Sequence, residues 1–254
     1  MKAKSPILIS VPHSGIKFPE EVRSYYKDKT LNSPGDTDWF IDQLYSFAPE
    51  LDIEIVVAPY SRYVIDLNRD PESKQLYQDS RQETGLIPSK SFSGEEILLK
   101  EINQEEAQRR LNAYYWPYYK MVQEKLDERI ELFSKCLLFD AHSIKRLVPK
   151  ISKDPFPDMI IGDADETSAD KSLIDCALRS LKKGPFEVAH NHPFKGGHIT
   201  RYFGKKSPSQ HALQLEMSQD LYMNEESIKY DEEKAPHVRE VLREMFKSLL
   251  KELS

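Results

Sequence analysis

Leu137-Leu138-Phe139-Asp140-Ala141-His142-Ser143 is the stretch on which the expected fold depends. The short apolar run Cys136–Phe139, bounded by polar residues, predicts a buried β-strand. This strand ends in Asp140, Ala141 and His142, where an open α/β sheet presents side chains to a ligand. An imidazole at that place can be a metal ligand or a general base that Asp140 orients, or it can simply cap the strand.

Length and composition are those of a globular protein with a substantial core. The chain has 254 residues, enough for one large α/β domain or two small ones. Its 42 acidic and 36 basic residues give a formal net charge of −6, which argues against a general nucleic-acid-binding protein. Cys136 and Cys176 fall on an expected strand and an expected helix, as small core residues in a reducing compartment. The apolar run Ile7–Val11 is too short for a signal peptide and no membrane span follows, so a cytoplasmic protein without membrane contact is predicted.

Expected strands and helices alternate along the chain. Strands are expected at 7–11, 53–58, 136–139, 159–161 and 211–217, and helices from 36, at 95–132 with a break at Pro117, at 171–183 and at 235–253. An extended piece is expected at 62–69 and a polar excursion at 71–94. Because no repeat or linker divides the chain, residues 1–254 are predicted to form a single α/β domain, with a mixed, mostly parallel sheet and helices on both faces.

Two histidines and an aspartate lie at the ends of expected elements. His13 follows the first strand, His142 ends the central one, and Asp38 stands near a helix start. Asp36 is interpreted as the N-cap of that helix, whereas Asp38 is freer to face a cation. Two imidazoles and one carboxylate form the ligand set of a catalytic zinc, which leaves a fourth position for water. These three residues are therefore candidate metal ligands, with capping as the competing interpretation.

Glu216 is singled out by the pattern of its strand. Period-two alternation over 212–217 places Leu213 and Leu215 on one face, and Gln214 and Glu216 on the other. A carboxylate inside a strand is costly to bury unless it is paired. Glu216 is thus either a solvent-facing residue of an edge strand or a general base beside an activated water.

A third group of residues predicts recognition of a carboxylate. Arg62 and Arg69 can make bidentate contacts with a carboxylate, and Asn68 adds an oriented amide. The competing interpretation for one of the arginines is a structural ion pair between Arg62 and Asp66.

The loop at 190–204 is rich in histidine and glycine. Its paired glycines allow close backbone approach to a ligand, and Arg201 can contact an acidic group or developing negative charge. A second metal site made of His190, His192 and His198 is not favoured, because no Cys or Asp supports it in the sequence.

Six motifs together resemble the N-formylglutamate amidohydrolase family over about residues 7–223. They are Pro12-His13-Ser14-Gly15, Asp36-Thr37-Asp38-Trp39, residues 61–69, Asp140-Ala141-His142-Ser143, residues 191–197 with Ile199-Thr200-Arg201, and Gln214-Leu215-Glu216. The family is similar to the zinc carboxypeptidases and aspartoacylase, so the resemblance implies a zinc-carboxypeptidase-like (phosphorylase/hydrolase-like) fold.

The resemblance also implies a role for each matched residue. His13, Asp38 and His142 would hold one Zn²⁺. Asp38 takes the place of a ligand Glu of the carboxypeptidases, because Ile16 stands at that position here, and Asp36 is the alternative to Asp38. Glu216 and Arg69 would be catalytic, and the substrate-binding residues would be Arg62, Asn68, Arg69, Asn191 and Arg201. His192 and His198 depart from the usual loop of the family, which leaves the identity of the substrate open.

The predicted function is zinc-dependent hydrolysis of the amide bond of a small acidic N-acyl amino acid. The resemblance makes N-formyl-L-glutamate the expected substrate, with formate and L-glutamate as products and histidine degradation as the setting. One alternative is a carboxypeptidase-like peptidase or another N-deacylase. Another is a non-catalytic protein that binds an acidic ligand on the same fold.

Overall fold

A six-stranded sheet forms the centre of the molecule, in the strand order β2-β1-β3-β6-β4-β5. The computed structural model describes residues 3–72, 84–204 and 206–254. The strands of the sheet are β1 (Ile7–Val11), β2 (Glu54–Val57), β3 (Cys136–Ile144), β4 (Met159–Gly162), β5 (Val188–His190) and β6 (Gln210–Ser218). Two short strands, β7 (Met223–Asn224) and β8 (Lys229–Tyr230), make a separate antiparallel pair.

The predicted α/β class with a mixed, mostly parallel sheet is confirmed. Parallel pairing joins β1 to β2, β1 to β3, β3 to β6 and β4 to β5, while β4 runs antiparallel to β6. β3 is buried along all nine residues, because it has a hydrogen-bonded neighbour on each side and packed layers above and below. The carboxyl ends of β1, β3 and β6 therefore meet at one edge of the sheet.

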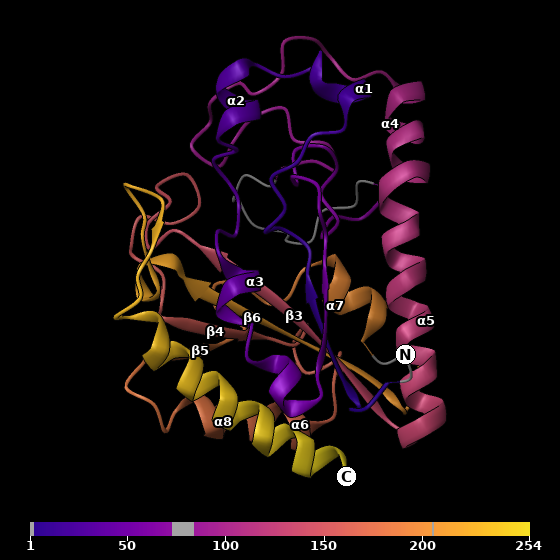
Figure 1. The fold of residues 1–254 in the computed structure, drawn as a ribbon, viewed down its shortest axis with the longest axis vertical. Coiled ribbons are helices and arrows are strands. Elements are labelled where there is room, and N and C mark those ends of the chain that lie inside the picture. Colours follow the sequence, from indigo (N-terminus) through magenta and orange to yellow (C-terminus); the bar gives the residue numbers. More distant parts are fainter. Residues whose placement is uncertain (1–2, 73–83, 205) are drawn as a thin grey trace.

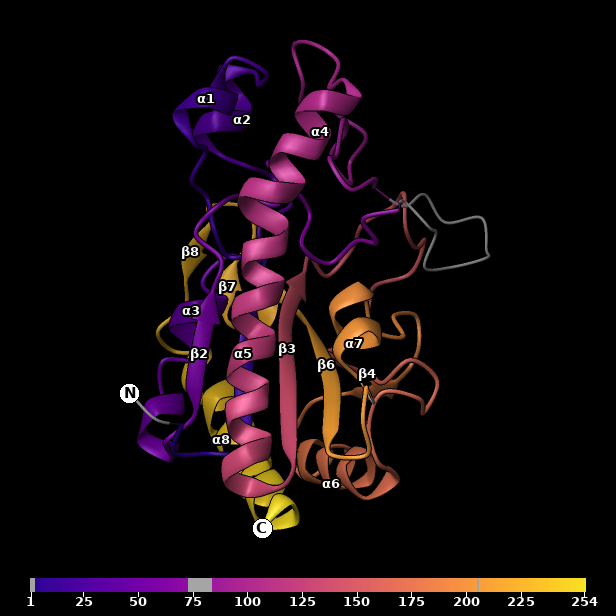
Figure 2. The same ribbon diagram turned by 90° about the vertical axis from the view of Figure 1, so that its right-hand side faces the viewer.

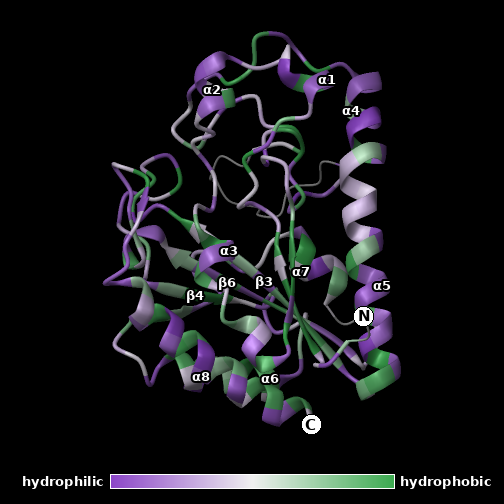
Figure 3. Cartoon of the chain, in the orientation of Figure 1, coloured by the Kyte–Doolittle hydropathy of each residue, from purple (hydrophilic) through white to green (hydrophobic). Residues whose placement is uncertain are grey.

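Helices cover both faces of the sheet (Figure 1). They are α1 (Glu20–Arg23), α2 (Asp28–Asn32), α3 (Ile41–Leu44), α4 (Gln104–Arg110), α5 (Trp116–Phe133), α6 (Lys171–Leu181), α7 (His198–Phe203) and α8 (Ala235–Leu253). Short 3₁₀ turns occupy Ala48–Leu51 and Gln219–Leu221. Figure 3 shows hydrophobic residues concentrated on the strands and hydrophilic ones on the outer helices.

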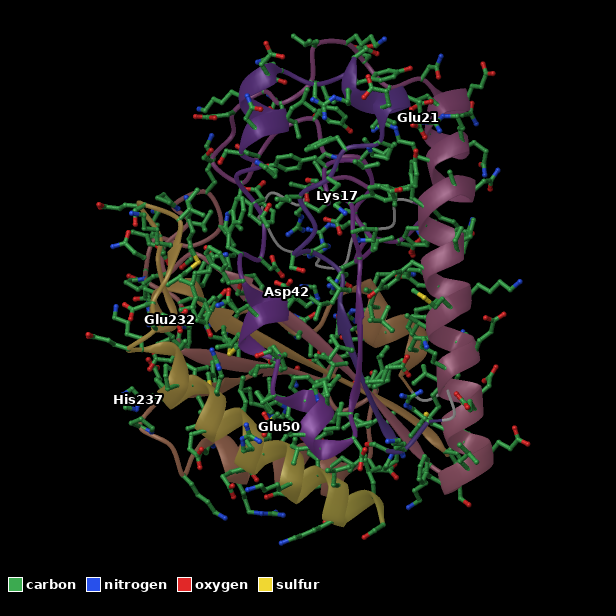
Figure 4. The ribbon with its side chains drawn as sticks, viewed as in Figure 1. Lys17, Glu21, Asp42, Glu50, Glu232 and His237 are labelled. Atoms are coloured by element: carbon green, nitrogen blue, oxygen red, sulfur yellow. The ribbon has the colours of Figure 1, made fainter. Side chains whose placement is uncertain are left out.

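One face of the sheet is apolar from end to end and carries α3, α6 and α8. The inward residues of β1, β3 and β6 join those helices in one core cluster, among them Ile9, Phe139 and Leu215 against Phe246. At the outer end of this layer, Arg243 of α8 donates to Glu50 at 2.7 Å, and Figure 4 shows Glu50 beside α8. This face contributes core stability.

The opposite face carries α5 and α7 and is apolar only near the start of the strands. Leu8, Leu138 and Ala212 pack there against α5, which runs beside β3 (Figure 2). The expected helical break near Pro117 takes the form of a π-helical turn, Leu111–Tyr115, directly before α5. Toward the strand ends this face becomes polar, and the candidate site lies there.

A small lobe covers the carboxyl-terminal edge of the sheet. It contains α1, α2 and the segment around Ile97, which pack around Tyr26 and Tyr63. The Tyr114 hydroxyl donates to Glu21 at 2.5 Å and ties α1 to the long helical segment, as the position of Glu21 in Figure 4 shows. The backbone amide of Lys17 donates to Pro59 where the lobe joins β2.

Two expectations about local structure are wrong. The helix expected from residue 36 begins only at Ile41, and its N-cap, Phe40, makes no side-chain capping bond. Asp36 is therefore not an N-cap and instead accepts the Phe92 amide at 2.8 Å. Residues 62–69 form a series of turns rather than an extended piece, because their carbonyls and side chains are taken up by local contacts. The excursion expected at 71–94 lies partly outside the described residues.

Cys136 and Cys176 are free and buried, as predicted. In the described part of the chain, no helix is both long and apolar enough to span a membrane.

Candidate functional site

His13, Asp38 and His142 meet at the carboxyl-terminal edge of the sheet. Their possible ligand atoms lie within 4.8 Å of one another, and all three residues are buried. His142 is on β3 and His13 follows β1, so the parallel pairing of these strands sets the two rings 4.9 Å apart. Asp38 comes from the loop before α3, and its backbone amide donates to the His13 carbonyl at 3.1 Å. The sequence-predicted set is thus brought together.

The two imidazoles are held in the same way. His13 Nε2 lies 2.8 Å from Asp66 Oδ1, and His142 Nε2 lies 2.9 Å from Asp140 Oδ2. A carboxylate on Nε2 keeps the proton there and directs the Nδ1 lone pair toward a metal. Both Nδ1 atoms face Asp38 Oδ2, at 3.9 Å from His13 and 3.0 Å from His142.

This arrangement fits a metal ion. His13 Nδ1 is buried and makes no hydrogen bond with any described residue, and a buried polar atom without a partner is costly. Two imidazole nitrogens and one carboxylate, each histidine backed by a second carboxylate, are the donor set of a zinc site with an open position. Among the described residues, this is the only group of three such side chains close enough to share an ion.

The surroundings move the pKa values of the two histidines in opposite directions. Burial and then the Arg62 guanidinium lower the pKa of His13, against the carboxylates of Asp66 and Asp38. Burial also opposes a charged His142, but Asp140 and Asp38 outweigh it and raise the pKa of that ring well above its ordinary value. The Nδ1 atom of His142 that faces Asp38 is the atom that a metal would take.

Arg62 belongs to the framework of this cluster. Arg62 Nη2 lies 2.6 Å from Asp66 Oδ2 inside the protein, and its guanidinium packs over the Phe92 ring at 4.8 Å. Burial by itself would raise the pKa of Asp66, but Arg62 and His13 hold that pKa well below its usual range. The structural ion pair considered from the sequence is present, and it orients the carboxylate that fixes His13.

A second chain of hydrogen bonds runs from α5 to His142 and fixes the orientation of its ring. Tyr118 of α5 lies 2.9 Å from Ser10 Oγ, and Ser10 donates to Asp140 Oδ1 at 2.9 Å. Asp140 Oδ2 then contacts His142, which is the orienting role that the sequence predicts for Asp140. Sequence reasoning missed Ser10 and Tyr118. The available signal was Ser10 itself, a polar residue inside an otherwise apolar strand.

Glu216 lies directly beside this cluster. It pairs in register with His142 on one side and with Ile160 on the other, so it belongs to an interior strand and the edge-strand interpretation is wrong. Alternation holds as predicted, because Leu213 and Leu215 enter the apolar core and Glu216 faces the site. Burial, opposed by the positive charge of His142, raises the pKa of Glu216 to about 8.

Asn68 touches the cluster in an unexpected way. Asn68 Nδ2 lies 3.0 Å from His142 Nε2, and Asn68 Oδ1 accepts the Ile199 amide at 2.8 Å. A Cβ at Gly197 would come within 2.2 Å of the Asn68 amide, so only glycine allows this close approach. Asn68 therefore packs between His142 and the start of α7.

The remaining predicted substrate-binding residues lie away from the cluster. Arg69 donates to the Thr84 carbonyl at 2.9 Å and to its hydroxyl at 3.1 Å. Asn191 donates to Asp163 at 2.6 Å, and exposed Arg201 donates to the Gly196 carbonyl at 3.2 Å. No contact among the described residues joins these three side chains to His13, Asp38 or His142.

The other histidines do not form a second ligand cluster within the described residues. His190 is the last residue of β5, and its Nε2 lies 2.6 Å from Asp163 Oδ2, while Asp163 Oδ1 accepts the Glu166 amide. His237 is exposed on α8, and Figure 4 places it at the periphery.

The fold and cluster define an α/β protein with a buried, metal-competent His–Asp–His group at the carboxyl edge of its sheet. A family model described as N-formylglutamate amidohydrolase matches residues 5–223, and the chain belongs to this family. Two relatives from Pseudomonas putida and Pseudomonas aeruginosa, each named N-formylglutamate deformylase, are 37% identical over 254 residues, covering 98% of this chain and 94% of theirs.

Solved structures agree with the family assignment. A crystal structure of an N-formylglutamate amidohydrolase from Ralstonia eutropha matches with a TM-score of 0.79 at 26% identity, covering 100% of this chain and 94% of the other. A protein from Agrobacterium tumefaciens shares the fold with a TM-score of 0.73 at 21% identity, covering 97% of this chain and 92% of the other. The predicted family and fold class are thus confirmed.

Proposed function

We propose that this protein hydrolyses the amide bond of a small acidic N-acyl amino acid with the help of one zinc ion. N-formyl-L-glutamate is the proposed substrate, with formate and L-glutamate as products. The observation that carries the proposal is the buried, unpartnered His13 Nδ1 facing Asp38 and His142. The substrate is suggested by the names of the two Pseudomonas relatives.

The zinc would be held by His13 Nδ1, His142 Nδ1 and the Asp38 carboxylate. When bound, zinc supplies a Lewis acid that polarises the acyl oxygen and lowers the pKa of water. Asp66 and Asp140 keep the two rings in the binding tautomer through Nε2.

Glu216 is the proposed general base. Its place beside His142 lets it take a proton from the attacking water and return it to the nitrogen of the leaving amine. The positive charge of Arg62 favours the ionised form that this step needs, and a bound zinc would add to it, against the cost of burial.

Recognition of the substrate carboxylate is assigned to Arg69, which is only partly buried and bonded to a single neighbour beyond Asn68. Asn68 would support it from its place beside His142. Arg201 is exposed and holds one backbone carbonyl, so it can turn toward a bound acid, and Asn191 would shape the same loop. Arg62 acts through Asp66 rather than on the substrate.

The test is to measure zinc content and hydrolysis of a panel of N-acyl amino acids and short peptides. Glu216→Gln should retain zinc and lose at least about 10²-fold in kcat, the usual contribution of a general base. Glu232→Gln makes the same chemical change at an exposed site near α8 and should leave both quantities unaltered. Full activity of Glu216→Gln would contradict the proposed base.

The same panel separates the alternatives. Cleavage of peptides without turnover of N-formylglutamate would favour a peptidase, and tight binding of an acidic ligand without any turnover would favour a non-catalytic protein. A single catalytic domain spanning residues 1–254, a cytoplasmic location and a role in histidine degradation remain predictions.

A further inference from the structure

Asp38 differs from the two histidines of the cluster in how its backbone is held. His142 lies inside β3 and His13 directly follows the end of β1, whereas Asp38 lies between α2 and α3, outside any helix or strand. A ligand in such a segment has backbone freedom, and the ordering of a metal site must remove that freedom at a cost in free energy. The place of Asp38 therefore depends on contacts made by the residues around it.

Two side chains that follow β6 hold the backbone on both sides of Asp38. Gln219 begins the 3₁₀ turn after this strand, and Tyr222 comes directly after the turn. Gln219 Nε2 donates to the Thr37 carbonyl at 2.9 Å. The Tyr222 hydroxyl donates to the Trp39 carbonyl at 2.9 Å. The residue before Asp38 and the residue after it are thus bound to the same short segment.

Ser143 connects these two hydrogen bonds to the Asp38 carboxylate. Gln219 Nε2 also donates to Ser143 Oγ at 3.3 Å, and Ser143 Oγ lies 2.7 Å from the Tyr222 hydroxyl oxygen. Since a carbonyl can only accept, the Tyr222 proton goes to Trp39 and the Ser143 proton goes to the Tyr222 oxygen. The backbone amide of Ser143 donates to Asp38 Oδ2 at 3.2 Å. One connected group therefore holds both the backbone beside Asp38 and its carboxylate.

The members of this group are buried. Tyr222, Gln219 and Ser143 are 0%, 3% and 4% exposed. Burial raises the pKa of the Tyr222 hydroxyl well above its ordinary value, so the hydroxyl keeps its proton and remains a donor. Buried donors restrict their acceptors more than exposed donors do, because bulk water cannot replace them.

We propose that Gln219 and Tyr222 are positioning residues for Asp38, which fix its backbone so that its carboxylate meets the two histidines in the geometry of a metal site. This role rests on the zinc binding proposed above, and the two residues act through their neighbours. β6 and the turn after it then place two parts of the site, since the strand carries Glu216 and the following segment holds Asp38.

The first test is the zinc dissociation constant, measured by competition with a chelator. Tyr222→Phe and Gln219→Met remove the donors and keep the approximate size of each side chain. Each change should raise the constant about tenfold, the usual effect of losing a group that orients a ligand. Tyr26→Phe is the matched control, because it removes another buried hydroxyl that donates to a backbone carbonyl, that of Tyr63. The control should be destabilised like Tyr222→Phe but bind zinc as the unchanged protein does.

The second test follows amide hydrogen exchange of the metal-free protein by NMR, and so does not depend on zinc. The Asp38 amide donates to the His13 carbonyl at 3.1 Å, so its exchange rate reports how firmly this backbone is held. It should exchange at least about tenfold faster in Tyr222→Phe and in Gln219→Met than in Tyr26→Phe, because local opening then costs one buried hydrogen bond less.

The inference is overturned if the Asp38 amide exchanges equally in all three variants. It is also overturned if Tyr222→Phe and Gln219→Met bind zinc as tightly as Tyr26→Phe does, which would leave both residues with a role in stability alone. Failure of the proposed function would show separately, as absence of zinc binding and hydrolysis in the unchanged protein. In that case the exchange of the Asp38 amide still decides whether the two residues position Asp38.

Discussion

The two faces of the central sheet are built from the same strands, but one face forms an apolar core and the other carries the candidate site. On one face, β3 contributes Leu137, Phe139 and Ala141 to an uninterrupted apolar core. On the other face, the alternate residues change from apolar Leu138 to Asp140 and His142 along the same strand. Because side chains alternate with a period of two, one strand can supply stability and chemistry at once.

Burial of polar groups on the second face costs free energy, and hydrogen bonds and ion pairs between these groups offset that cost. Several buried ionisable groups there have an oriented partner, as in Arg62 with Asp66 and Asp140 with Ser10. Only His13 Nδ1 is left without one among the described contacts of the cluster. The comparison predicts that changes on the two faces will separate stability from metal binding and activity.

The largest expected effect is that of His142→Ala. Removal of one of three ligands should abolish stoichiometric zinc binding and reduce activity at least about 10³-fold, equivalent to roughly 4 kcal/mol. Metal analysis after gel filtration and assays of the purified variant measure this. His237→Ala, at an exposed position of α8, is the control. Unchanged zinc content in His142→Ala would remove His142 from the ligand set.

On the apolar face, Phe139→Ala should lower the free energy of unfolding by about 3–5 kcal/mol, because it leaves a cavity in a fully buried core. Urea unfolding followed by circular dichroism measures it. The fraction that remains folded should still bind one zinc ion. Loss of metal binding by well-folded Phe139→Ala would show that the two faces are not separable.

Glu216→Gln should stabilise the metal-free protein at pH 7–8. The folded pKa of Glu216 is about 8, above its ordinary value of 4.5, so between these values the folded state binds one more proton than the unfolded state. Stability of the metal-free protein therefore falls as pH rises through this window, and Glu216→Gln removes the loss, on the order of 1–3 kcal/mol. Urea midpoints from pH 5 to 8 test this, and parallel curves for the two proteins would refute it.

The smallest of these effects is expected for Ser10→Ala, which removes a positioning residue. Asp140 would lose one of its hydrogen bonds, and the zinc dissociation constant should rise about tenfold, within the range for partners behind a ligand. Competition with a chelator measures this, and Ser10→Thr should restore most of the affinity by keeping the hydroxyl. Ser5→Ala is the control, because it removes another hydroxyl just before β1 that accepts the Ile7 amide. Equal changes of the zinc dissociation constant in Ser5→Ala and Ser10→Ala would assign the effect to strand stability alone.

The strands were predictable because their signals are local. The apolar run at 136–139 and the alternation around Glu216 both correspond to strands of the structure, which extend to Cys136–Ile144 and Gln210–Ser218. The helix start near Asp36 was not predictable, because Asp36 is taken by the Phe92 amide from a distant segment. The reversed direction of β4 likewise has no signature in its four residues.

The sequence by itself determined which side chains could do chemistry, since His13, Asp38, His142 and Glu216 end or interrupt apolar patterns that local rules detect. Tertiary structure alone decided which of them meet and what supports them. Asp66, Ser10 and Tyr118 act across separations of 53, 130 and 108 residues, to His13, Asp140 and Ser10 respectively. The physical reason is that alternation within a strand is a property of neighbouring residues, whereas the partner of a buried polar group depends on how distant segments pack.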